Sequence, residues 1–301
     1  MYVPPGHDLR APGALLVGLH PWNGSIWTYA AYQELLRAAD ARDVILLLPS
    51  GLGNSLYTAD AEDEVLRAID ALSSVAAVRP LDVSVWGASM GGAGATTIAF
   101  HHPDRFAAVT SFFGDSRYDR STYVRSILAD ERAAHAVNAL DVVENARNLP
   151  VWLVHGEDDA TSPILQSALL ADSLREHGFA VRFDRVPGIG HSGALVARFV
   201  AQVVDRAATM HATAAPGRVS YRSVRPEDVG AYGVHIERAG GDAFVDVERR
   251  ADGLHVLHAE GVRAIALDRG ALGTGREEPP AIVLDDATAG RVRLGWRDPS
   301  P

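Results

Sequence analysis

The chain has 301 residues, of which 28 are basic and 38 acidic, so its formal net charge is −10. Every basic residue counted there is an arginine, and the chain has 0 cysteines. Because lysine and cysteine are absent, the composition excludes Schiff-base chemistry, pyridoxal-phosphate and P-loop lysines, thiol nucleophiles, disulfides and thiolate metal sites.

Charge and hydropathy also bound the partners and the location. The acidic balance argues against nucleic acid or an anionic membrane as a partner, because both require a positive surface. No apolar run approaches the ~20 residues of a membrane span, and residues 1–10 do not read as a signal peptide. We therefore expect a cytoplasmic location by default, with a composition of bacterial type, and a monomer or homodimer.

Residues 1–210 have the pattern of an α/β domain. Short apolar runs alternate with longer amphipathic segments, which predicts a mostly parallel sheet with helices on both faces. The expected strands are 14–19, 44–48, 83–86, 107–112, 151–154 and 181–185. The expected helices are 30–39, 61–78, 90–101, 164–177 and 193–210.

One segment of this domain breaks the alternation. Residues 115–149 are too long for a simple crossover between strands. Two interpretations stay open: a small cap over the carboxyl end of the sheet, or a crossover helix with a long entry loop.

The composition changes after residue 210. Residues 211–217 are small and polar and contain a proline and a glycine, which indicates a linker. The remainder, 218–301, has no helical period and predicts a small antiparallel, sandwich-like all-β domain. Its expected strands are 218–224, 231–237, 243–248, 253–258, 264–267, 281–284 and 292–296.

The clearest motif follows the third expected strand. Residues 87–91 read GASMG, between an apolar strand and a helix. G-x-S-x-G at such a junction is typical of a nucleophile elbow, which exposes the serine on a strained turn. The motif predicts Ser89 as a nucleophile; the alternative is a glycine-rich turn with an inert serine.

A serine nucleophile requires a histidine base and a carboxylate that orients it. The fifth expected strand runs into HGEDDATSP at 155–163, and the sixth is followed by VPGIGHSG at 186–193. Both loops lie at carboxyl ends of parallel strands, where open α/β sheets place their sites. Both therefore supply candidates for the acid and the base.

These phrases, together with LHPW at 19–22 and HPDRF at 102–106, resemble the α/β-hydrolase superfamily. Within it, the chain is similar to prolyl-oligopeptidase-like and dienelactone-hydrolase or feruloyl-esterase-like serine hydrolases. The resemblance implies Ser89 as nucleophile, Asp159 as acid and His191 as base. Asp158 is the rival acid, and Glu157 is read as a solvated loop charge.

The resemblance also implies an oxyanion hole. Its two donors would be the backbone N–H groups of Met90 and Trp22. Pro21 stands where the family usually has glycine, so the loop is expected to be shaped differently. Asn23 is the substitute donor for Trp22.

Aromatic residues near these loops are candidates for an acyl pocket, and no metal or cofactor site is predicted. The proposed lining residues are Trp27, Phe113, Tyr118 and Tyr123, with Tyr29 and Tyr57 as further candidates. The histidine pair at 101–102 is interpreted as a helix-end cap.

The family's first strand, and most of its second, are expected to be missing, which would leave a sheet edge unpaired. Three hypotheses follow: the C-terminal β segment covers or extends that edge, a second chain covers it, or the fold is trimmed and the β segment is independent.

The expected function is a serine carboxylesterase acting on small-molecule or polymer esters, including aryl or feruloyl-type esters. Peptide-cleaving relatives usually carry a gating propeller, for which 301 residues leave no room. The alternatives are a small peptidase or amidase, and an inactive binding module for a polysaccharide or polymer.

Overall fold

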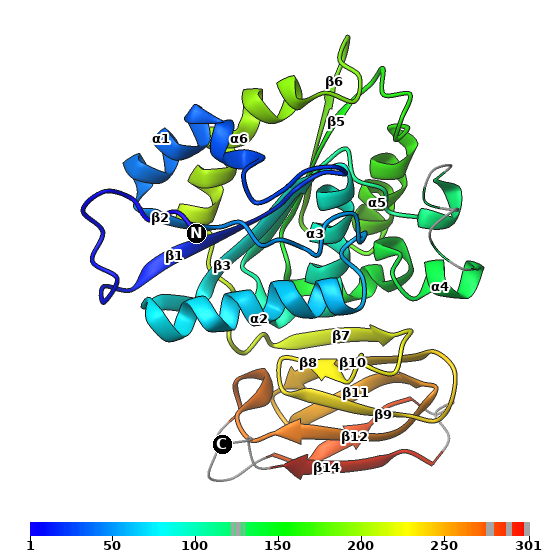
Figure 1. Ribbon diagram of the computed structural model, residues 1–301. Coiled ribbons are helices and arrows are strands. Elements are labelled where there is room, and N and C mark those ends of the chain that lie inside the picture. Colours follow the sequence, from blue (N-terminus) through cyan, green and yellow to red (C-terminus); the bar gives the residue numbers. More distant parts are fainter. Residues whose placement is uncertain (122–123, 125–127, 129, 275–279, 287–290, 298–301) are drawn as a thin grey trace.

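The computed structural model describes residues 1–121, 124, 128, 130–274, 280–286 and 291–297. It contains an α/β domain and, after it along the chain, a β domain that lies beneath it in Figure 1. Among the described residues, no helix is both long and apolar enough to cross a membrane.

The α/β domain is built on one six-stranded, fully parallel sheet in the order β2-β1-β3-β4-β5-β6. Most of its strands are buried on both faces, which is why they read as continuous apolar runs. The strands are β1 (Gly13–Leu19), β2 (Val44–Leu47), β3 (Val78–Ala88), β4 (Ala108–Phe112), β5 (Val151–Gly156) and β6 (Val181–Val186).

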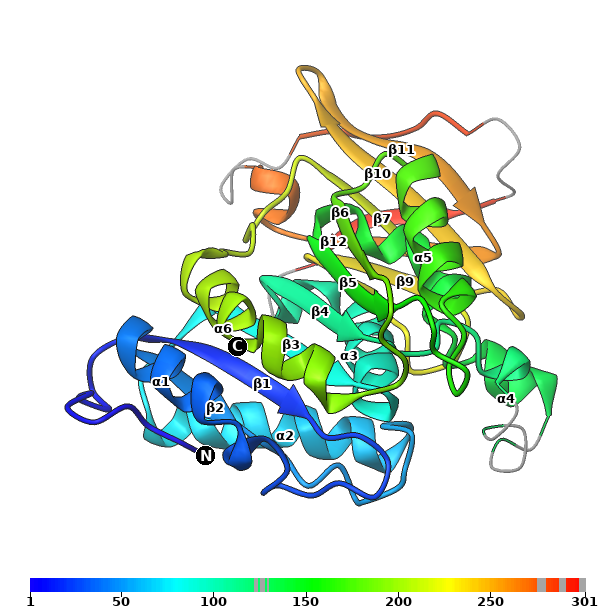
Figure 2. The ribbon, with the colours of Figure 1, turned by 90° about the horizontal axis from the view of Figure 1, so that it is seen from above.

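Helices cover both faces of this sheet, as the sequence predicted. One core cluster joins the sheet to α1 and α6, which lie side by side in Figure 2. The other cluster joins the opposite face to α2, α3, α5 and the 3-10 segment η5. The elements are α1 (Gln33–Arg42), α2 (Asp60–Val75), α3 (Met90–His101), α5 (Leu165–Glu176), α6 (Gly193–Thr209) and η5 (Ala139–Asn148).

The helix expected over 30–39 spans Gln33–Arg42 instead. The predicted boundary between the second helix and the third strand is also wrong. The helix expected over 61–78 ends at Val75, and β3 begins at Val78 instead of 83. Pro80 disfavours helical backbone in the residue before it. The first residues of β3 are largely exposed, so they lack the apolar signal of a buried strand.

In the described residues of the segment 115–149, the elements are η3 (Tyr118–Arg120), α4 (Glu131–His135) and η5. The side chain of Asp130 caps α4 by accepting a hydrogen bond from the N–H of Ala133. η5 packs against α3 and α5, so this part of the segment acts as the crossover between β4 and β5.

The β domain consists of two four-stranded sheets, β13-β11-β10-β7 and β14-β12-β9-β8, whose inner faces share one apolar core. The expectation of a purely antiparallel arrangement is wrong, because β13 pairs with β11, and β14 with β12, in parallel. The expected strand 231–237 is also divided, because Tyr232 and Gly233 both have positive φ and form a turn.

The bounds of these strands are β7 (Arg218–Ser223), β8 (Gly230–Ala231), β9 (Val234–Arg238), β10 (Ala243–Arg250), β11 (Gly253–Glu260), β12 (Val262–Asp268), β13 (Ile282–Leu284) and β14 (Arg293–Arg297).

The hypothesis that the C-terminal strands extend the edge of the parallel sheet is wrong. They pair only with one another in the described part of the chain. At the outer strand β2, Tyr2 instead makes an antiparallel bridge to Leu46, with backbone N···O distances of 2.8 and 3.0 Å. The hydroxyl of Tyr2 also donates to Asp40 at 2.5 Å.

The β domain docks on η5 through its edge strand β7 (Figure 1). The side-chain amide of Asn145 donates to the carbonyl of Arg222 at 3.0 Å and accepts from its N–H at 2.5 Å, as a neighbouring strand would. Asn148 donates to the carbonyl of Arg218 at 2.9 Å. These amides satisfy backbone groups that an edge strand would otherwise leave unpaired.

Buried charges form a second contact between the domains. Arg225, between β7 and β8, donates to Glu62 of α2 at 2.8 Å and to Asp228 at 2.9 Å. His102 and His101 at the end of α3 bond to Glu62 at 2.7 Å and to Asp228 at 2.8 Å. Burial alone would raise the pKa of Glu62, but the bonds from His102 and Arg225 outweigh it and lower the pKa to about 2.

Glu62 should therefore stabilise the fold in a pH-dependent way. Because its folded-state pKa is lowered, its contribution is present above its ordinary value near 4.5 and is lost as the pH falls towards 2. We expect Glu62→Gln to reduce the free energy of unfolding by about 3 kcal/mol at pH 7, and by less at pH 3. Urea titrations at both pH values measure this.

The matched control is Glu34→Gln. Glu34 pairs with Arg37 on the surface of α1, so its loss should change the free energy of unfolding by less than about 0.5 kcal/mol. An equal effect of Glu62→Gln at both pH values would contradict the prediction.

Candidate active site

Ser89 occupies a strained turn between β3 and α3. Its backbone angles, φ 57° and ψ −121°, lie outside the regions that L-residues favour. Its N–H donates to the carbonyl of Phe112 in β4 at 2.9 Å. The predicted elbow motif therefore adopts the conformation that presents a serine side chain above the sheet.

Glycine at position 91 lets this turn approach β1. A Cβ atom there would lie 1.8 Å from the carbonyl oxygen of Leu19, the last residue of β1. No side chain fits at that distance. Because glycine has no side chain, the start of α3 packs against the loop that carries Trp22.

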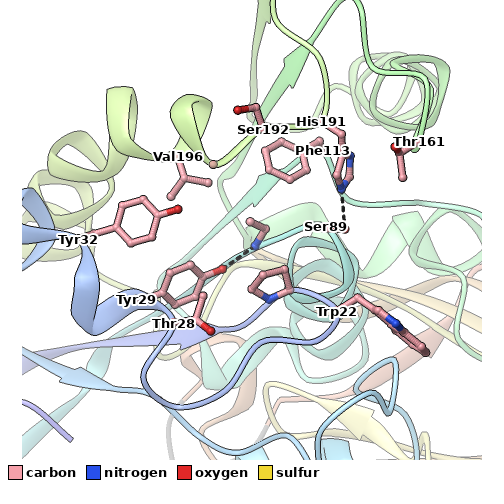
Figure 3. A pocket seen from close by; sticks show the side chains of 13 residues that line it. Trp22, Thr28, Tyr29, Tyr32, Ser89, Phe113, Thr161, His191, Ser192 and Val196 are labelled. Atoms are coloured by element: carbon pink, nitrogen blue, oxygen red, sulfur yellow. Dashed lines mark hydrogen bonds between the residues drawn. The ribbon is translucent and has the colours of Figure 1, made fainter.

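Three loops bring Ser89, His191 and Asp159 together. The Nε2 atom of His191 lies 2.8 Å from the Oγ atom of Ser89 (Figure 3). The Nδ1 atom of His191 lies 2.7 Å from the Oδ2 atom of Asp159. The loops follow β3, β5 and β6, at the same edge of the sheet. With Nδ1–H donating to the carboxylate, Nε2 is free to accept the serine proton.

Asp159 is buried and held by several donors. The backbone N–H groups of Thr161 and Ser162 each donate to its Oδ1 atom at 2.9 Å. Burial alone would raise the pKa of Asp159, but hydrogen bonds from His155, Ser162 and His191 lower it to about 2. The carboxylate therefore stays charged at neutral pH.

The two other acids of this loop do not reach the histidine. Asp158 and Glu157 are both exposed, and Glu157 pairs with Arg185 at 3.1 Å. Glu157 is thus a surface charge, as predicted, and the structure places Asp159 rather than Asp158 against His191.

His155 supports the carboxylate from behind and is a residue that the sequence analysis did not single out. It is fully buried, with Nε2 2.8 Å from the carbonyl of Ser162 and 3.4 Å from Asp159. A carbonyl oxygen only accepts, so Nε2 carries a proton and Nδ1 is left to pair with Ser167 at 2.7 Å. The only available signal was a histidine at the end of a buried strand.

Of the two predicted oxyanion donors, Met90 follows Ser89 directly in the chain and Trp22 lies on the loop after β1. Met90 is the first residue of α3, so its N–H is among the amides that have no acceptor within the helix. Trp22 lines the pocket near Ser89 in Figure 3. Asn23 is not among the pocket residues; its side chain accepts from Asn54 at 2.8 Å.

His20 anchors the loop on which Trp22 lies. Its Nε2 atom bonds the carbonyl of Ser50 at 2.8 Å, and its Nδ1 atom faces the carbonyl of Pro21 at 2.9 Å. A turn closes the loop, with Gly24 donating to Pro21 at 2.8 Å. The loop with proline in the family's glycine position is therefore fixed to the neighbouring 50–57 loop.

A pocket of ≈ 680 Å³ opens beside Ser89. Phe113 lies in it, edge-on to His191 with ring centroids 4.5 Å apart. The residues that line it are Pro21, Trp22, Thr28, Tyr29, Tyr32, Ala88, Ser89, Phe113, Thr161, His191, Ser192, Gly193 and Val196.

Two predicted pocket residues are wrong. Trp27 is 73% exposed and does not line the pocket. Tyr118 is buried in the core, where its hydroxyl donates to the carbonyl of Leu56. Tyr57 is likewise buried in that core, and Tyr123 lies outside the described residues.

Sequence reasoning missed Tyr32. It is the N-cap residue of α1 and falls within the helix expected over 30–39, a position that does not mark its side chain as facing a site. Only the folded chain brings it opposite the start of α6. The described residues of 115–149 contribute nothing to the pocket lining, so they give the cap interpretation no support.

The described residues contain no group of three His, Cys, Asp or Glu side chains arranged to hold a metal ion. The fold and the site together define a serine hydrolase of the α/β-hydrolase superfamily. Residues 53–210 match the model of the prolyl oligopeptidase family, and the chain belongs to this family.

Solved structures share the fold. An S-formylglutathione hydrolase from Agrobacterium tumefaciens is 20% identical, with a TM-score of 0.62 over 70% of this chain and 88% of that one. FphF, a fluorophosphonate-binding serine hydrolase of Staphylococcus aureus, is 17% identical, with a TM-score of 0.58 over 68% and 87%. A ferulic acid esterase is 16% identical, with a TM-score of 0.55 over 67% and 87%. No curated protein sequence matches the chain.

The reactivity of Ser89 should depend on the hydrogen bond between Asp159 and His191. Asp159→Asn should slow labelling of Ser89 by a fluorophosphonate about 10³- to 10⁴-fold, because an amide no longer fixes the tautomer of His191 or stabilises its cation. The labelling rate is measured by quenching the reaction at set times and determining the labelled fraction by mass spectrometry. Asp158→Asn is the control and should label at the wild-type rate; slowing by this variant alone would contradict the assignment.

Proposed function

We infer that this protein is a serine carboxylesterase. The observation that carries the inference is the continuous chain of hydrogen bonds from Asp159 through His191 to Ser89, which ends at an apolar pocket. A serine that is hydrogen-bonded to a histidine base attacks acyl carbonyls. The pocket provides an apolar surface that suits an uncharged substrate.

The proposed reaction has two steps, acylation of Ser89 and hydrolysis of the acyl-enzyme. The Oγ atom of Ser89 bonds to the ester carbonyl carbon while its proton passes to the Nε2 atom of His191. The imidazolium then returns this proton to the departing alkoxide, which leaves as the alcohol. Water attacks the acyl-enzyme by the same route and releases the carboxylic acid.

Two neighbouring groups assist these steps. Asp159, whose pKa is lowered to about 2, remains ionised and stabilises the imidazolium of His191. The N–H groups of Met90 and Trp22 are the proposed donors to the oxyanion of each tetrahedral intermediate. The proposed reaction uses no cofactor.

The pocket favours an ester over a peptide. Among the lining residues that the structure describes there is no Asp, Glu or Arg, so these residues offer no carboxylate or guanidinium to bind a peptide terminus. Solved neighbours that are described as esterases support the same choice. A peptidase or amidase, as the family name implies, is the second candidate.

The third candidate is a binding module without activity. The triad distances of 2.7 and 2.8 Å argue against it, because an inactive scaffold does not require this geometry.

The test is a panel of short and aromatic esters beside proline-containing peptide amides, run with wild type and Ser89→Ala. We expect ester hydrolysis that the substitution reduces by about 10⁴-fold or more, because the nucleophile is removed. Wild type should react with one fluorophosphonate per chain, at Ser89. Faster cleavage of peptides than of esters would favour the peptidase, and absence of both labelling and turnover would favour the binding module.

A further inference from the structure

The pocket extends from Ser89 to Tyr32. In Figure 3, Ser89 lies at one side of the cavity and Tyr32 at the other, with Tyr29, Phe113 and Val196 between them. Most of the side chains between the two ends are aromatic or aliphatic, and the small hydroxyl side chains of Thr28 and Ser192 also line the cavity. A group bound to Ser89 and directed along this path would therefore contact apolar surface for most of its length.

The hydroxyl of Tyr32 differs from that of its neighbour Tyr29. Tyr29 donates to the carbonyl of Leu19 at 2.8 Å and accepts from the N–H of Ala88 at 3.0 Å, so its hydroxyl is fully used in joining β1 to β3. Tyr32 lines the same pocket, but its hydroxyl makes no hydrogen bond to any residue that the structure describes. It is available to a ligand.

The surroundings keep this hydroxyl accessible and neutral. A Cβ atom at Gly193, in the first turn of α6, would lie 2.7 Å from the hydroxyl oxygen of Tyr32. Glycine at this position therefore leaves the space beside the hydroxyl open. Burial raises the pKa of Tyr32, so the phenol stays protonated and can both donate and accept a hydrogen bond.

We propose that this pocket binds an aromatic group of the ester and that Tyr32 is a specificity-determining residue, which hydrogen-bonds a polar substituent at the far end of that group. The inference rests on the proposed esterase function and adds the class of substrate. A volume of ≈ 680 Å³ is ample for one aromatic ring with a short chain.

A hydroxyl that a bound ligand covers without pairing loses its hydrogen bonds to water without compensation. An unsubstituted ring would leave Tyr32 in that state, whereas a ring with a para-hydroxyl group would satisfy it. The hydroxyl of Tyr32 would therefore favour the para-hydroxylated ring over the unsubstituted ring.

The experiment uses two matched pairs of esters, since the aromatic group can belong to the acid or to the alcohol. Methyl para-hydroxycinnamate and methyl cinnamate test the acyl side. Para-hydroxyphenethyl acetate and phenethyl acetate test the alcohol side. We expect a preference in kcat/KM of about threefold to tenfold for the hydroxylated member of one pair, the effect of one neutral hydrogen bond.

Tyr32→Phe should abolish this preference, because it removes only the hydroxyl. Tyr2→Phe is the matched control: its hydroxyl bonds to Asp40 at the sheet edge, so the preference should stay. Equal kcat/KM within both pairs, or a preference that survives Tyr32→Phe, would overturn the proposal.

A binding assay separates this inference from the proposed function. Para-hydroxycinnamyl and cinnamyl alcohols compete with fluorophosphonate labelling of Ser89. If wild type is labelled but hydrolyses no ester, the esterase proposal fails, while protection by the hydroxylated alcohol that Tyr32→Phe weakens still supports the pocket. Equal protection by both alcohols in wild type would overturn the role of Tyr32.

Discussion

The site depends on one close backbone contact, between the end of β1 and the first turn of α3. Only glycine fits at position 91, where a Cβ would lie 1.8 Å from the carbonyl of Leu19. This approach seats the elbow and holds Ser89 in its positive-φ conformation next to the loop of Trp22. The strain at Ser89 persists because β1, β3 and β4 hold the turn on both sides.

The catalytic residues and the contacts between the two domains lie in different parts of the α/β domain. The carboxyl ends of the parallel strands carry the hydrogen-bonded chain of Asp159, His191 and Ser89. The β domain docks elsewhere, on α2, α3 and η5, through Asn145 and the buried pair of Glu62 with Arg225. None of its described residues lines the pocket. Its contacts therefore stabilise the layer of helices behind the sheet.

Much of the α/β domain was predictable because its signals are local. Buried parallel strands read as apolar runs, and the helix at 90–101 has the bounds that its sequence predicts. Motif order also indicated which serine, histidine and aspartate the fold brings together. The strand pairing of the β domain was harder to predict. β13 pairs in parallel with β11, and β14 with β12, so the partners are distant along the chain. The alternation of apolar residues along a strand is the same whether it pairs in parallel or antiparallel.

The sequence by itself determined the fold class of the first domain and the available chemistry, since residue types and strand-to-helix junctions are properties of short segments. Only the tertiary structure decided the pocket. Trp27 and Tyr118 are as aromatic as Tyr32, yet one is exposed and the other lies in the core. Which aromatic ring lines the pocket depends on how loops from distant parts of the chain pack, and no local sequence pattern encodes that packing. The supporting position of His155 behind Asp159 has the same origin.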